Sequence, residues 1–121
     1  MKIAIPTNNQ PAPDAVIAEH FGRCNFYSIF NQQGELIEVI KNNGQHMGGS
    51  LNPPQILKKH KIDILICKNL GPKAIDLCDQ LKIKVYLCTE NNTKTCLNLF
   101  INNKLDKASQ KFACQDHKHN I

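Results

Sequence analysis

Hydrophobic and polar positions along the chain follow two different periods, which together predict a mixed α/β fold. The short apolar stretch Lys2–Thr7 and the aromatic stretch Asn25–Asn31 are typical of strands, and the continuous apolar run Ile62–Cys67 is typical of a strand buried on both faces. Later segments repeat apolar residues at helical spacing, as in the stripe from Ala74 to Leu81. The expected elements are strands over 2–7, 25–31 and 36–40, a helix over 53–60, a strand over 62–67, a helix over 72–81, a strand over 85–88 and a helix over 93–103.

Turn and cap signals separate these elements and set their connectivity. Residues 32–34, ending in Gly34, are typical of a hairpin turn. Asn52 followed by Pro53 and Gln55 indicates a capped helix start. The first three strands are therefore expected to form an antiparallel meander, and the last two, joined through helices, to run parallel. The order β-β-β-α-β-α-β-α predicts a mixed five-stranded sheet with helices on its faces.

Length and composition narrow the class of protein. A chain of 121 residues with 41% hydrophobic and 21% charged residues is typical of one globular domain. No apolar run approaches the ~20 residues of a membrane span, and Pro6 interrupts the start before a signal peptide's apolar stretch could form. We expect a cytoplasmic protein without a membrane partner, with a domain over residues 1–107 and a flexible tail over residues 108–121.

Charge does not favour a nucleic-acid partner. Of the net +5, residues 1–60 contribute +1 (five basic, four acidic) and residues 61–121 contribute +4 (ten basic, six acidic), as scattered lysines without an arginine cluster or interleaved aromatics. A metal-dependent nuclease needs carboxylates clustered at strand ends, starting on the first strand. That strand ends in Thr7 instead. A nucleic-acid enzyme would have to use the scattered acids Asp14, Glu19, Asp63 and Asp76.

Six cysteines are a conspicuous count for a chain of this size, but no pair has the CxxC spacing of a zinc ribbon or a redox motif. For a cytoplasmic protein they do not indicate a disulfide framework. Cys67 and Cys88 end predicted parallel strands, where they either face a ligand crevice or are buried as small hydrophobic residues. Burial is the favoured interpretation for both. Cys78 and Cys96 fall on or beside the inward faces of helices and are expected to be structural.

Several segments in order carry a resemblance to a known family. They are the first strand MKIAIPT, the segment Glu19–Arg23 (EHFGR), the loop from His46 to Ser50, DILIC at 63–67 and LGPKAI at 70–75. With these, residues 1–107 resemble the nitrogenase iron–molybdenum cofactor biosynthesis family. The resemblance implies a ribonuclease H-like three-layer fold and a non-enzymatic protein. It also implies binding or carriage of a sulfide cluster containing iron, or molybdenum with iron or copper, with a cluster donor or acceptor protein as partner.

The EHFGR segment supplies the first candidate ligands. His20 can coordinate a metal through a neutral ring nitrogen, and the resemblance implies that it does; otherwise it is an exposed loop histidine. Beside it, Phe21 belongs to the same implied binding segment, Gly22 allows close approach, and Arg23 can balance the charge of an anionic cluster. Cys24 is either a soft thiolate ligand or a small residue at a strand edge, where the family more often has a small residue.

Two further loops complete the implied site. His46 matches a family position and can approach His20 across the sheet end, or it is exposed and uninvolved. Gly71 opens a helix whose free N–H groups suit an anion, with Lys73 adding charge. Lys68-Asn69 stands where the family usually has glycines, whose lack of side chains lets backbone approach a ligand.

The tail carries a separate metal-binding hypothesis. Cys114, His117 and His119 are three metal-ligating side chains within six residues, in a spacing that matches no standard zinc module. Zinc or copper handling by this tail is therefore an alternative function, with adventitious metal binding as the simpler interpretation.

Overall fold

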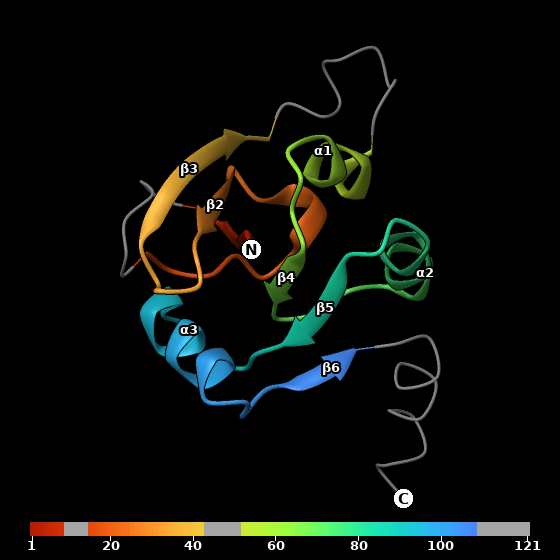
Figure 1. Cartoon of the computed structure of the whole chain (residues 1–121). Helices are drawn as coiled ribbons and strands as arrows, with labels where there is room; N and C mark the ends of the chain where they lie inside the picture. Colours follow the sequence, from red (N-terminus) through yellow and green to blue (C-terminus); the bar gives the residue numbers. More distant parts are fainter. Residues whose placement is uncertain (9–14, 43–51, 109–121) are drawn as a thin grey trace, which may run out of the picture.

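A mixed six-stranded sheet with helices on both faces makes up the fold. The computed structural model describes residues 1–8, 15–42 and 52–108 (Figure 1). Its elements are β1 (Ile3–Thr7), a single 3-10 turn η1 (Phe21–Arg23), β2 (Phe26–Phe30), β3 (Leu36–Lys41), α1 (Pro53–Lys59), β4 (Ile64–Cys67), α2 (Pro72–Gln80), β5 (Lys84–Leu87), α3 (Thr93–Ile101) and β6 (Asp106–Ala108).

The strands lie in the order β3-β2-β1-β4-β5-β6. β1, β2 and β3 pair antiparallel, and β1, β4 and β5 pair parallel. These pairings confirm the predicted meander and the predicted parallel strands. Since the parallel strands point the same way, the sheet has an amino edge, where β1, β4 and β5 begin, and a carboxyl edge, where they end.

The prediction of five strands is wrong, because β6 adds a sixth, antiparallel to β5. No strand was expected after the helix over 93–103. β6 has only three residues, of which Ala108 is buried while Asp106 and Lys107 are exposed. So short a segment has no detectable period. It becomes a strand because the backbone of β5 offers unpaired hydrogen-bonding groups at the edge of the sheet.

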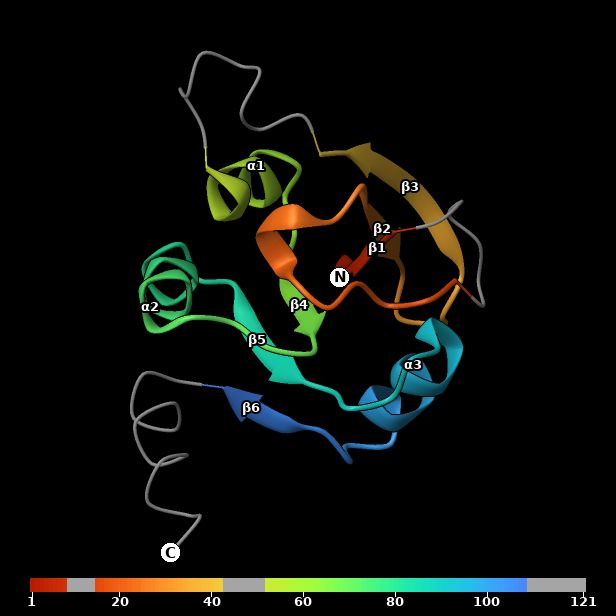
Figure 2. The same cartoon turned by 180° about the vertical axis from the view of Figure 1, so that it is seen from behind.

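Two hydrophobic cores separate the helices onto opposite faces. The core on one face includes Leu57 of α1 and Ile75 of α2, together with Phe21 and Ala4. The core on the other face lies under α3 and includes Ile3, Ile5, Cys96 and Leu97. Alternation along β1 sends neighbouring side chains into different cores. Figures 1 and 2 show α1 and α2 side by side, with α3 apart from them.

The apolar residues of α3 do not all face inward. Ile101 is 45% exposed, whereas Leu97 is buried and Phe100 packs against the core under α3. The buried stripe of α3 runs through Thr93, Cys96 and Leu97. A helix has 3.6 residues per turn, so Ile101 falls beside that stripe and not within it.

Cys88 and Cys96 form a disulfide, with their Cα atoms 6.3 Å apart. The expectation that no cysteines are cross-linked is therefore wrong for this pair, although both are buried as predicted. Their spacing of eight residues matches no redox or metal motif. Only the packing of α3 beside the end of β5 brings the two sulfur atoms together.

The local signals were predicted correctly. Asn52 and Gln55 form a reciprocal capping box at the start of α1. Gly34 adopts φ +86° in the hairpin turn, a conformation that disfavours a side chain. Within the ranges described, no helix has the length and apolar character needed to cross a membrane.

Candidate functional site

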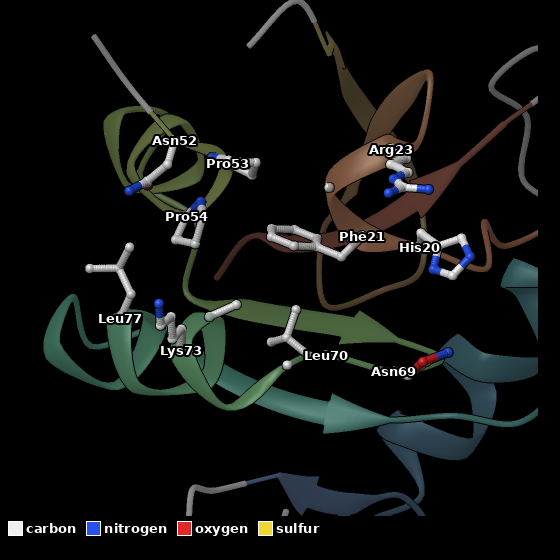
Figure 3. A pocket seen from close by; sticks show the side chains of 13 residues that line it. His20, Phe21, Arg23, Asn52, Pro53, Pro54, Asn69, Leu70, Lys73 and Leu77 are labelled. Carbon is white, nitrogen blue, oxygen red and sulfur yellow. The ribbon is translucent and has the colours of Figure 1, made fainter. Parts of the chain in front are cut away.

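A cavity of about 580 Å³ opens at the carboxyl edge of the sheet, between η1 and the first turns of α1 and α2. In open α/β sheets this edge is the usual place for ligands. Figure 3 shows its lining side chains coming from three separate segments. The lining residues are His20, Phe21, Gly22, Arg23, Asn52, Pro53, Pro54, Asn69, Leu70, Gly71, Lys73, Ala74 and Leu77.

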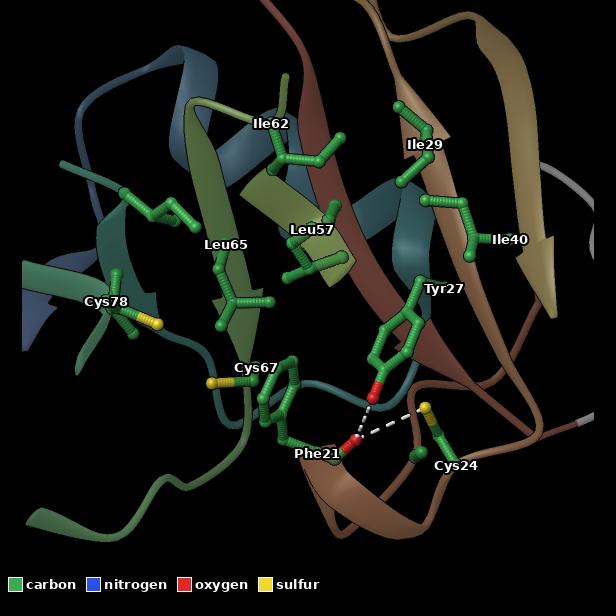
Figure 4. Close-up of a cluster of buried hydrophobic side chains, with 14 of the residues drawn as sticks. Phe21, Cys24, Tyr27, Ile29, Ile40, Leu57, Ile62, Leu65, Cys67 and Cys78 are labelled. Carbon is green, nitrogen blue, oxygen red and sulfur yellow. Dashed lines mark hydrogen bonds between the residues drawn. The ribbon is translucent and has the colours of Figure 1, made fainter. Parts of the chain in front are cut away.

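The turn η1 is held by hydrogen bonds to its own backbone oxygens. The buried Tyr27 hydroxyl donates to the Phe21 carbonyl oxygen (2.9 Å), and Cys24 Sγ donates to the same oxygen (3.3 Å; Figure 4). The Tyr27 and Phe21 rings pack with their centroids 5.3 Å apart. Asn42 Nδ2 donates to the carbonyl oxygens of Gly22 (3.2 Å) and Cys24 (2.8 Å). These contacts fix the backbone that carries the pocket's His20 and Arg23.

The segment that leads into η1 is fastened to the turn between β4 and α2. Asn69 Nδ2 donates to the Glu19 carbonyl oxygen (3.2 Å). Lys68 Nζ forms an ion pair with Glu19 Oε1 (3.3 Å) and also donates to Asn91 Oδ1. Thus Asn69 lines the pocket, whereas Lys68 binds residues beside it and is not among the lining residues.

Within the described part of the chain, the charged side chains that line the pocket are all basic. Arg23 and Lys73 line it together with His20, and no described aspartate or glutamate does. Among the described residues, neither Arg23 nor Lys73 forms an ion pair. Gly71, which has no side chain to cap α2, places the amino end of that helix at the pocket. The partial positive charge of a helix amino end adds to that of the side chains. The arrangement therefore suits an anion.

Apart from the amides of Asn52 and Asn69, the other side chains of the lining are apolar. These apolar side chains come from η1, α1, α2 and the turn before α2: Phe21, Pro53, Pro54, Leu70, Ala74 and Leu77. Such walls give little hydrogen bonding to a strongly hydrated ion. They favour an anion with a large, weakly hydrated body.

The free cysteines among the described residues, Cys24, Cys67 and Cys78, are buried and do not line the pocket. Burial raises the pKa of the Cys24 thiol to about 11, that of Cys78 to about 11 and that of Cys67 to about 12. At neutral pH these groups are thiols, whereas a metal ligand is the thiolate. Within the described part of the chain, no three His, Cys, Asp or Glu side chains gather in a way that could hold a metal ion.

Six residues predicted for the site lie together around this pocket. They are His20, Phe21, Gly22, Arg23, Gly71 and Lys73. Cys24 follows η1 but directs its sulfur at the Phe21 carbonyl. His46 and the tail residues Cys114, His117 and His119 lie outside the described residues.

The acids weighed for a nuclease site do not gather in the part described. Glu19 lies at the carboxyl edge, whereas Asp63 lies at the amino edge and accepts a hydrogen bond from the Lys2 backbone N–H (2.9 Å). Asp76 is on α2, where it accepts one from Gln80 (2.9 Å). Asp14 is outside the described ranges.

Sequence reasoning missed the wall of the pocket that α1 supplies. Asn52 and Pro53 were interpreted only as helix-start signals, and Pro54 and Leu77 were not considered as lining residues. A helix-start signal predicts where a helix begins along the chain. It does not predict which cavity the first residues of that helix line. The missing information is the contact between α1 and α2, which only the packed sheet establishes.

Comparison with known proteins now adds to this geometry. The family whose description is "Dinitrogenase iron-molybdenum cofactor" matches residues 1–103. The chain belongs to this family. The match confirms the resemblance seen in the EHFGR and LGPKAI segments, and it covers every residue that lines the pocket.

The chain is also similar to a sequence relative and to several solved structures. An uncharacterized protein of Methanocaldococcus jannaschii is 32% identical over 113 residues, covering 88% of this chain and 91% of that protein. The apo orange protein of Desulfovibrio gigas has a similar fold, with a TM-score of 0.76 at 23% identity over 88% of this chain and 92% of that one. A candidate dinitrogenase of M. jannaschii has a TM-score of 0.68 at 24% identity, over 90% and 95%. Family membership associates the chain with proteins of iron–molybdenum cofactor metabolism.

Proposed function

We propose that the pocket binds an anionic sulfide cluster containing iron, molybdenum or both, and that the chain carries or stores this cluster for metallocluster assembly. In this proposal the protein is not an enzyme, works in the cytoplasm, and exchanges the cluster with a donor or acceptor protein. The helices on both faces of the mixed sheet also support the ribonuclease H-like three-layer fold that the family resemblance implies.

The observation that carries the proposal is the sign of the charge around the pocket. Arg23 and Lys73 line it, with no carboxylate among the described lining residues. Both side chains are exposed, so salt screens their attraction for an anion, and each adds positive charge to the cavity that it lines. Metal–sulfide clusters commonly carry negative charge and have polarisable sulfide surfaces, which also suit the apolar walls.

The lining residues that can coordinate a metal are few, which favours a cluster held by few direct bonds between protein and metal. Among the described lining residues, His20 supplies an imidazole that can coordinate a metal. The buried free thiols of the described residues do not line the pocket. We assign His20 as the direct ligand, with Arg23 and Lys73 as charge partners of the sulfides. A cluster held in this way can leave without breaking several thiolate bonds, which suits a carrier.

Anaerobic titration with tetrathiomolybdate, a soluble metal–sulfide dianion, tests the proposal. Arg23→Ala/Lys73→Ala should lower its affinity about tenfold or more, since a charge-assisted hydrogen bond contributes roughly 1.5–3 kcal/mol. Lys58→Ala/Lys84→Ala removes the same charge from exposed positions away from the pocket and should bind like the wild type. His20→Ala should weaken binding and change the absorption spectrum of the complex.

The same variants can be tested with a cluster assembled from iron, sulfide and molybdate. Anaerobic reconstitution with iron, sulfide and molybdate should give a coloured wild-type protein and a colourless Arg23→Ala/Lys73→Ala protein. If the pocket variant and the control variant bind equally, the assigned site is wrong.

A further inference from the structure

A single carboxylate stands beside the His20 end of the otherwise basic pocket. Glu19 directly precedes His20, and its side chain is 66% exposed. Its partner Lys68 directly precedes the lining residue Asn69, and the Lys68 side chain is only 13% exposed. The ion pair between them therefore joins the two segments that supply His20 and Asn69.

We propose that Lys68 determines the anion affinity of the pocket by neutralising Glu19. This inference rests on the proposed function, because it assumes that the pocket takes an anion. An uncompensated carboxylate next to His20 would repel that anion and would compete with it for Arg23. Lys68 is well placed to prevent this, because its buried stem and its second hydrogen bond, to Asn91 Oδ1, hold the ammonium group on Glu19.

Asp76 is the other described carboxylate that adjoins a lining residue, and it does not need a lysine to neutralise its charge. Asp76 precedes Leu77, and its Oδ2 accepts a hydrogen bond from the Gln80 side chain (2.9 Å), one turn farther from the amino end of α2. Glu19, in contrast, lies at the end of the pocket where His20 would coordinate the cluster. Its charge is the one whose neutralisation matters for the ligand.

The backbone around Glu19 is held without the ion pair. Asn69 Nδ2 donates to the Glu19 carbonyl oxygen, and the Ala18 N–H donates to the Pro6 carbonyl oxygen (2.8 Å). Loss of the Lys68 charge therefore leaves the segment in place and changes mainly the electrostatic potential. This separates our proposal from a purely mechanical role, in which the ion pair would act as a clasp.

The two roles predict opposite results for Glu19. If Lys68 neutralises charge, Lys68→Met should lower tetrathiomolybdate affinity about two- to fivefold, the range of an exposed ion pair. Glu19→Gln should bind at least as well as the wild type, and Lys68→Met/Glu19→Gln should recover wild-type affinity. The Lys68→Met defect should shrink at high salt because of screening. Lys84→Met, which removes one exposed lysine at the start of β5, is the matched control and should bind normally.

Three results would overturn the inference. They are unchanged affinity in Lys68→Met, a loss in Glu19→Gln as large as that in Lys68→Met, or a double variant that stays weak. In each of these cases the wild type still binds, so the proposed function survives. A wild-type chain that does not bind tetrathiomolybdate would overturn the proposed function and this inference together.

Discussion

At the amino edge of the sheet, Glu38 accepts hydrogen bonds from Lys2 Nζ (3.4 Å) and His60 Nδ1 (2.8 Å), which ties β3 to the start of β1 and the end of α1. At the carboxyl edge, Arg23 and Lys73 line a cavity that no carboxylate of the described residues lines. Lys2 at the amino edge and Lys68 at the carboxyl edge each have an acidic partner in the fold, Glu38 and Glu19. The two basic side chains that line the cavity form no ion pair within the described part of the chain.

This difference separates stability from binding. Paired charges at the amino edge join elements distant in sequence, so the folded chain uses them internally. Like charges left together at the carboxyl edge repel one another and contribute nothing favourable until an anion enters. The contacts that hold η1 and the segment before it therefore keep basic groups near one another in the absence of ligand. Substitutions at the two edges can therefore be told apart by measuring both the free energy of unfolding and the anion affinity.

The largest effect on stability should come from the Cys88–Cys96 disulfide. Cys88→Ala/Cys96→Ala should lower the free energy of unfolding by about 2.5 kcal/mol, the loop-entropy value for so short a loop. The loop it closes also holds the segment before His20, since the Ile17 N–H donates to the Asn91 carbonyl oxygen (2.7 Å). Anion affinity should therefore fall as well. Urea unfolding and tetrathiomolybdate titration measure the two effects.

A reductant supplies the control for this prediction. Treatment with a dithiol should destabilise the wild type toward the variant and leave the variant unchanged. Equal stability of the untreated wild type and the variant would contradict a stabilising role for the disulfide.

Next in size is Tyr27→Phe, which removes the hydroxyl that donates to the Phe21 carbonyl oxygen. Because the site is buried, we expect a loss of about 1–2 kcal/mol in unfolding free energy and weaker anion binding from a looser η1. Tyr86→Phe is the matched control, since Tyr86 packs against Phe100 on the α3 side of the sheet. A Tyr27→Phe protein that is less stable but binds normally would show that this hydrogen bond does not organise the pocket.

The smallest effect should come from Glu38→Gln at the amino edge. Burial raises the pKa of Glu38, but the hydrogen bonds from His60 and Lys2 and the charges of both together outweigh it, so that the pKa lies below its usual range. The carboxylate therefore stabilises the fold above the ordinary glutamate pKa of about 4.3, and this contribution is lost as pH falls through the lowered value.

The measurement for this prediction is thermal unfolding of both proteins across pH. The variant should be about 0.5–1 kcal/mol less stable at pH 7, with the gap closing in acid and with anion affinity unchanged throughout. A stability difference between the two proteins that persists below pH 3, or a change in anion affinity, would contradict the view that Glu38 acts on stability alone.

Much of the fold could be predicted from local patterns. The capping box at Asn52, the turn at Gly34 and the buried run Ile62–Cys67 depend on interactions within a few residues, so the sequence itself encodes them. The EHFGR and LGPKAI segments likewise indicated where pocket residues would come from. By contrast, β6 and the Cys88–Cys96 disulfide could not be predicted, because each needs a partner that only packing supplies.

The sequence by itself therefore determined the order of strands and α-helices from β1 to α3, since hydrophobic period and chain connectivity decide it. The family resemblance added which residues of the EHFGR and LGPKAI segments belong to the site. Only the tertiary structure decided how side chains at the carboxyl edge are used. It turned Cys24 toward the Phe21 carbonyl, placed Pro54 of α1 opposite α2, and paired Lys68 with Glu19. The physical reason is that a side chain's contacts depend on neighbours far away in the sequence, whose positions no local pattern specifies.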